Sequence, residues 1–72
     1  MTLREAKEAA AHKGKAVLTV IEPPYTMVAW KHGRSTVYGF AKCSPLDKFD
    51  HDRGVAIATG RAIAQVARRL AE

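Results

Sequence analysis

The chain has 72 residues, of which 47% are hydrophobic and 26% charged, a composition typical of one folded domain that excludes a disordered or low-complexity chain. Twelve Lys and Arg residues outnumber seven Asp and Glu residues, and the net charge of +5 permits an anionic partner such as nucleic acid. So short a chain has no room for a cofactor domain beside a substrate domain.

The cysteine content and the hydropathy predict a cytoplasmic protein. Cys43 is the single cysteine, so no disulfide forms within the chain, and a reducing compartment is expected. No apolar run approaches the roughly 18 residues that a membrane span requires, and residues 1–14 lack the apolar core of a signal peptide. We therefore expect no membrane association.

The start of the chain predicts a helix followed by a strand. Thr2 and Glu5 match a capping box, and the apolar spacing that follows predicts a helix over residues 2–13. Gly14 is expected to end this helix in the left-handed conformation. Residues 15–22 are rich in β-branched side chains and predict a strand, which the two prolines that follow must end.

The remaining chain predicts a hairpin and a long helix. Strands are expected over residues 25–31 and 34–43, joined by a two-residue turn, His32-Gly33, in which glycine supplies a positive φ. Asp50 or Asp52 would cap a final helix that runs nearly to the end of the chain. Its inward stripe is predicted to hold Ala56, Thr59, Ile63, Val66 and Leu70, and its outward stripe Arg61, Gln65, Arg68 and Glu72.

The order of these elements predicts a single α+β domain over residues 1–72. The arrangement α-β-β-β-α gives a three-stranded antiparallel sheet, and so small a domain must place both helices on one face of it to share a core.

The predicted hairpin sorts its side chains into two faces. A turn at His32 and Gly33 places Lys31 opposite Arg34, and residues opposite one another share a face of the sheet. We expect the helices to cover the face without charges, which holds Val28, Trp30, Val37, Gly39, Ala41 and Cys43. The solvent side then holds Tyr25, Met27, Ala29, Lys31, Arg34, Thr36, Tyr38, Phe40 and Lys42.

The solvent side combines aromatic rings with cations, and three interpretations stay open. Bases stacked on rings beside cations are how sheet modules hold single-stranded nucleic acid. The same residue types are enriched in protein interfaces, so an inhibitor or adaptor of a host or viral protein complex is the alternative. In the third interpretation the side chains only cover one another and bind nothing. The candidate binding residues are Tyr25, Met27, Lys31, Arg34, Tyr38, Phe40 and Lys42.

Two further sets of residues are candidates for partner contacts. A secondary basic surface is predicted from Lys13, Lys15, Arg61 and Arg68, which contact phosphate or are ordinary solvated cations. Small residues at four-residue spacing on the final helix predict close packing, either on the first helix or in a homodimer. This stripe consists of Ala56, Gly60 and Ala64, with Ile57 at its edge.

No pattern in the sequence predicts catalysis, a metal or a cofactor. His51 lies between Asp50 and Asp52, which at a helix start favours polar capping over acid–base chemistry. Cys43 and the three histidines lack the spacing of a metal site, and no nucleophile elbow or Gly-rich phosphate loop is present. We expect a binding module and not an enzyme, with no cofactor and no metal.

The α-β-β-β-α order resembles the double-stranded RNA-binding domain over nearly the whole chain. That family binds RNA through its first helix, the loop between strands 1 and 2, and a Lys-rich start of its last helix. Here the last helix begins with Asp50-His51-Asp52-Arg53, and the loop is Pro23-Pro24-Tyr25, without the family's histidine. The resemblance therefore implies the fold and not the binding of duplex RNA.

The segment over residues 35–54, 20 of the 72 residues, contains Ser35-Thr36-Val37-Tyr38, Ala41-Lys42-Cys43-Ser44-Pro45, Asp47-Lys48-Phe49-Asp50 and Gly54. This segment is similar to segments of short uncharacterised proteins of phages and prophages. In those proteins a strand ends in a V-K-C or A-K-C step before an acidic, Phe-containing turn and an Ala-rich helix. The resemblance implies a viral accessory protein and supplies no chemistry.

Overall fold

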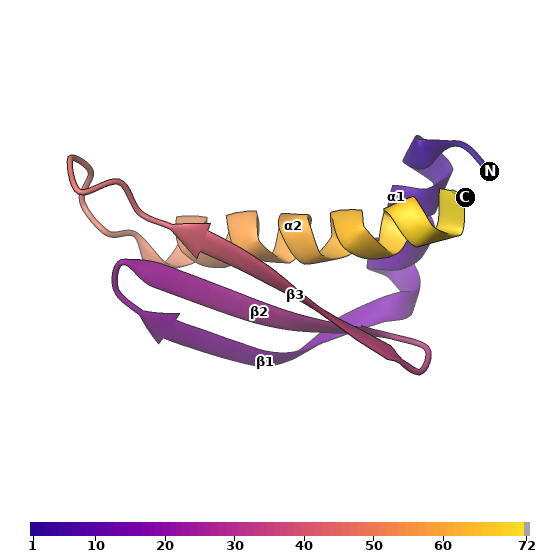
Figure 1. The fold of residues 1–72 in the computed structure, drawn as a ribbon, viewed down its shortest axis with the longest axis horizontal. Helices are drawn as coiled ribbons and strands as arrows, with labels where there is room; N and C mark the ends of the chain where they lie inside the picture. The colour runs from indigo at the N-terminus through magenta and orange to yellow at the C-terminus, as the bar shows by residue number, and fades with distance from the viewer. Residues whose placement is uncertain (72) are drawn as a thin grey trace.

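A computed structural model describes residues 1–71 of the chain, so Glu72, expected on the outward stripe of the final helix, lies outside the described residues. The three strands form one antiparallel sheet in the order β1-β2-β3, and both helices lie on the same side of it (Figure 1). The expected α-β-β-β-α fold is thereby confirmed. The elements are α1 (Leu3–Lys13), β1 (Gly14–Glu22), β2 (Tyr25–His32), β3 (Ser35–Lys42) and α2 (His51–Ala71).

Helix α1 begins at the predicted capping box but ends differently from the prediction. The Glu5 amide donates to the Thr2 hydroxyl at 3.2 Å, and the Glu5 carboxylate accepts from the Thr2 backbone N–H at 3.2 Å. Gly14 has φ −105° and opens β1 directly, so it is not a left-handed cap. Glycine is required there for space, because a Cβ on Gly14 would overlap the Trp30 indole and lie 2.7 Å from the Ala10 carbonyl oxygen.

The β2–β3 turn consists of Gly33 and Arg34, one position later than predicted. Gly33 alone has a positive φ (62°), which is the pattern of a type II′ turn with glycine at its first central position. His32 therefore pairs with Ser35 and Lys31 with Thr36, not with Arg34. The opposed positions move by two residues along β3, an even number, so every strand residue keeps its predicted face.

Helix α2 lies in direct backbone contact with β3. A Cβ on Gly39 would overlap the Ala58 carbonyl oxygen and lie 2.7 Å from the Ala62 amide nitrogen. This close approach rotates the buried stripe of α2 to Ala58 and Ala62, while Ala56, predicted to point inward, is exposed. The core beneath α2 consists of Ala6, Ala10, Val28, Val37, Ala41, Ala58, Ala62, Val66 and Ala67.

Trp30 joins the sheet to α1. Its indole nitrogen donates to the Ala10 carbonyl at 3.1 Å, which satisfies a carbonyl in the last turn of the helix. At the other end of the molecule, the Asp50 carboxylate accepts from the Arg53 amide at 3.2 Å and caps α2 as predicted. The helices are thus tied to one face, and the opposite face of the sheet carries no helix.

Candidate binding surface

The face of the sheet that points away from both helices is open to solvent. Opposed residues of the three strands lie in rows across it, because each register places one residue of every strand side by side. We call this surface the open face. Its rows are Glu22, Tyr25 and Lys42; Val20, Met27 and Phe40; Leu18, Ala29 and Tyr38; and Lys15, Lys31 and Thr36.

Three aromatic rings stand exposed on the open face. Tyr25, Tyr38 and Phe40 are 54%, 48% and 58% exposed, respectively. Tyr38 and Phe40 are alternate residues of β3 and therefore lie about 7 Å apart along the strand. Tyr25 lies on the neighbouring strand, in the row beside that of Phe40. The Lys42 ammonium stands 5.6 Å from the centre of the Tyr25 ring, within cation–π range.

Several cations lie at the end of the open face that is nearest the β2–β3 turn. Lys15 and Lys31 are directly opposed across β1 and β2, although like charges in that position destabilise a sheet. Arg34 lies in the adjacent turn, and Lys13 precedes Gly14, which pairs with His32. These cations therefore lie near one another at the β2–β3 turn end of the sheet. Among the residues that form the rows, Glu22 is the one acid.

Two side chains of the open face are less accessible than expected. Met27 is half-buried in the centre of its row, between Val20 and Phe40. Ala29 is 2% exposed, because the larger side chains of its row stand on both sides of its methyl group. The aromatic side chains therefore project above a shallow apolar floor.

Strand β1 contributes apolar surface that the sequence analysis did not assign to the site. Leu18 is 52% and Val20 40% exposed, and both lie on the open face beside residues of β2. The signal was present in the sequence, because a two-residue turn at Pro23-Pro24 pairs Glu22 with Tyr25 and fixes the faces of β1. The shift at Val17 then returns Lys15 to the same face as Leu18.

The arginines of α2 do not join the open face. The Arg61 guanidinium donates to the Phe40 carbonyl at 2.6 Å, so it links α2 to β3. Gln65, which also belongs to the predicted outward stripe, donates its amide to the Tyr38 carbonyl. Arg68 is exposed on α2, which lies on the opposite side of the sheet. The predicted secondary surface is therefore divided, with its two lysines near the open face and its arginines on α2.

The small-residue stripe of α2 does not pack against α1. Ala56, Ile57 and Gly60 are exposed, Ala64 is half-buried, and a Cβ on Gly60 would meet no atom within 4 Å. Helix α1 instead contacts α2 through a cluster that contains Ala6, Ala10, Ala62, Val66 and Ala67. The stripe is thus open helix surface.

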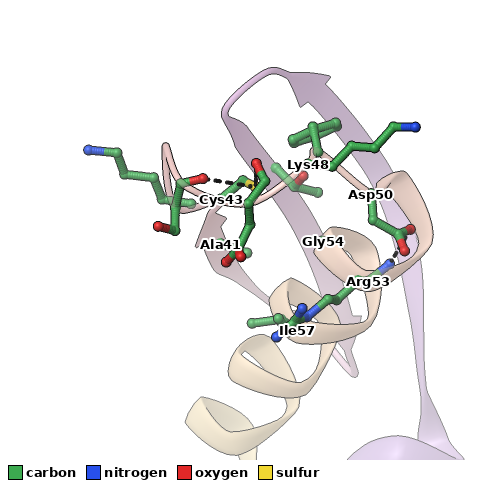
Figure 2. Close-up of a pocket in the computed structure, with 12 residues that line it drawn as sticks. Ala41, Cys43, Lys48, Asp50, Arg53, Gly54 and Ile57 are labelled. Carbon is green, nitrogen blue, oxygen red and sulfur yellow. Dashed lines mark hydrogen bonds between the residues drawn. The ribbon is translucent and has the colours of Figure 1, made fainter.

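A pocket of about 200 Å³ lies on the helix side, between the end of β3, the 44–50 loop and the first turns of α2 (Figure 2). Cys43, expected to be buried, is half-buried in its wall, with Sγ 3.5 Å from the Ser44 carbonyl oxygen. The Thr26 hydroxyl in the lining is buried and has no hydrogen-bond partner among the described residues. The charged residues of this lining are three cations, Lys42, Lys48 and Arg53, and two acids, Asp47 and Asp50.

The described residues contain no group of three or more side chains that could hold a metal ion, and none of their helices is both long and apolar enough to cross a membrane. Comparisons with protein-family models, with curated proteins and with solved structures found no match.

Proposed function

We propose that the chain is a small, basic, non-catalytic module that binds single-stranded nucleic acid on its open face. The observation that carries this proposal is the placement of three exposed rings on adjacent strands. Cations lie in the rows on either side of the two apolar rows. A viral accessory protein is what the resemblance of residues 35–54 to phage and prophage proteins implies, and the single Cys43 supports a cytoplasmic location.

The rings would supply affinity that depends little on base sequence. Every base has a π-face, and one base stacked on an aromatic side chain contributes about 1–3 kcal/mol. The spacing of about 7 Å between Tyr38 and Phe40 lets separate bases use the two rings. Lys31, Lys15 and Arg34 at one end, and Lys42 at the other, would then contact the phosphates that flank these bases.

Single strands suit this surface better than duplexes do. A stacked base must leave its helix, and only an unpaired base presents its face to a ring. The start of α2, where a duplex-binding domain of this topology carries lysines, holds Asp50 and Asp52 here, and their carboxylates would repel phosphate.

Fluorescence anisotropy with a labelled oligothymidine of about 12 nucleotides tests the proposal. We expect Tyr38→Ala to weaken binding by about tenfold, because one stacking contact is lost. Lys31→Ala should lower the slope of log affinity against log salt by about 0.7, the value for one phosphate contact on a single strand.

Two control variants remove similar groups elsewhere. Leu46→Ala removes an exposed apolar side chain from the 44–50 loop, and Arg68→Ala removes a cation from the helix side. Leu46→Ala should leave the affinity and the salt slope unchanged. Arg68→Ala should lower the affinity only by the small, non-specific effect of one lost positive charge. Absence of binding at low salt, or equal losses for Tyr38→Ala and Leu46→Ala, would contradict the proposal.

A protein partner, bound by an inhibitor or adaptor of a host or viral complex, is the second candidate function. It is favoured by Leu18, Val20 and Met27 on the open face. These aliphatic side chains suit a protein interface, whereas a nucleic-acid base would stack better on an aromatic ring. Capture from a host lysate before and after nuclease treatment separates the two, because a protein complex survives the nuclease.

A further inference from the structure

The two edges of the sheet differ in whether side chains form hydrogen bonds with their outward backbone groups. At the β3 edge, Arg61 and Gln65 of α2 donate to the carbonyls of Phe40 and Tyr38, which occupies these outward acceptors. At the β1 edge, no side chain of residues 1–71 forms a hydrogen bond with the backbone of β1. In Figure 1, β1 forms the border of the molecule farthest from α2.

The free edge of β1 is long and apolar. The strand has nine residues, and apart from the half-buried Gly14 all of them are exposed, including Val17, Leu18, Val20 and Ile21. Proteins usually protect such an edge, because its free N–H and C=O groups pair readily with another strand. The described residues protect the other edge and leave this one available.

The antiparallel alternation identifies which groups of β1 are free. The carbonyls of Tyr38 and Phe40 point away from β2, so the main-chain groups of Ala29 and Met27 point toward β1. The main-chain groups of Leu18 and Val20 therefore point toward β2 and form hydrogen bonds with Ala29 and Met27. The N–H and C=O groups of Thr19 and Ile21 therefore point to the free edge.

The side chains of β1 are complementary to a second β1 that runs in the opposite direction. With Thr19 opposite Thr19, each Leu18 faces a Val20 on the open-face side, and each Ala16 faces an Ile21 on the helix side. The shift at Val17 adds one residue to the strand, so that Lys15 comes to face Glu22. The cation that normally discourages edge pairing is thereby placed opposite a carboxylate.

We propose that two copies of this chain pair through β1, antiparallel about a two-fold axis at Thr19, into one six-stranded sheet. The occupied β3 edges stop further growth, so the assembly closes at two copies. The axis is perpendicular to the sheet, and both open faces lie on the same side. This inference does not depend on what the open face binds.

Sedimentation over a concentration series, in the absence of nucleic acid, tests the proposal. The wild-type mass should rise from 7.9 kDa to twice that value with concentration. Thr19→Pro removes an outward N–H without touching the β1–β2 ladder and should abolish the dimer, whereas Thr19→Val should retain it. Hydrogen exchange of the Thr19 and Ile21 amides should slow as the concentration rises, while the Leu18 and Val20 amides stay protected throughout.

A charge exchange separates dimerisation from folding. K15E places a carboxylate opposite Glu22 of the second copy and should weaken the dimer by about tenfold, since attraction becomes repulsion twice per dimer. Within one chain the same change replaces the Lys15–Lys31 repulsion by attraction, so the monomer stays folded. K15E combined with E22K should restore the dimer. A monomer at every concentration, or a dimer that neither Thr19→Pro nor K15E weakens, would overturn the proposal.

Discussion

Replacement of Gly39 by alanine tests the close contact between α2 and β3 on which the core depends. The new Cβ would overlap the Ala58 carbonyl oxygen and lie 2.7 Å from the Ala62 amide nitrogen. Both neighbours are helix backbone, so no side-chain rotation can relieve the overlap. Helix α2 must move outward by roughly 1 Å, and that displacement loosens its contacts with the sheet along the helix.

The cost is large relative to the stability of so small a domain. Overpacking of a core costs about 1–3 kcal/mol, and backbone on both sides of the contact favours the upper end of that range. A chain of 72 residues has a free energy of unfolding of about 4–11 kcal/mol. With a urea dependence of about 1 kcal/mol per molar, Gly39→Ala should lower the unfolding midpoint by about 3 M.

Urea titrations followed by far-ultraviolet circular dichroism measure this shift, with Gly60→Ala as the matched control. Gly60 lies on exposed helix surface where a Cβ meets nothing within 4 Å, so the methyl should stabilise α2 by about 1 kcal/mol through helix propensity. The same substitution is thus expected to have opposite signs at the two positions. A wild-type midpoint for Gly39→Ala, or a lowered midpoint for Gly60→Ala, would refute the packing described here.

Two further predictions concern single polar contacts. Thr26→Val should raise the free energy of unfolding by about 1 kcal/mol, because it removes a buried hydroxyl without a partner; a loss of stability in the same titration would show that the hydroxyl is bonded. The Thr2 hydroxyl, and then the Thr2 backbone N–H, hold the pKa of Glu5 below its ordinary value of 4.5. A lowered folded-state pKa gives stability that is present above the unfolded-state value and lost as the pH falls through the folded-state value. The melting temperature of the wild type should therefore fall toward that of Glu5→Gln as the pH drops below 4.5, and parallel curves would contradict this.

The sorting of the hairpin side chains was predicted from the sequence although the turn was placed one residue early. Moving a two-residue turn by one position changes the opposed pairs but leaves each residue on the same face, so Val28 and Tyr38 point as expected. The Thr2 cap was also predicted correctly, and Asp50 is one of the two residues predicted to cap α2, because a cap is satisfied within its own turn of helix.

Longer-range contacts were predicted less well. The rotation of α2 toward Ala58 and Ala62 occurs because Gly39 of β3 has no side chain. The apolar periodicity of α2 holds no information about the residues of β3, so it could not predict this rotation. The same contact brings Arg61 to the Phe40 carbonyl and removes it from the predicted basic surface.

The amino-acid sequence by itself determined the order of the elements, the capped helix starts and the face on which each hairpin residue lies, since these follow from spacing within a few residues. Only the tertiary structure decided how closely α2 approaches the sheet, which cations remain free and which strand edge is left open. Those outcomes depend on steric fit and hydrogen bonds between residues about twenty or more positions apart, and a local pattern carries no record of such contacts.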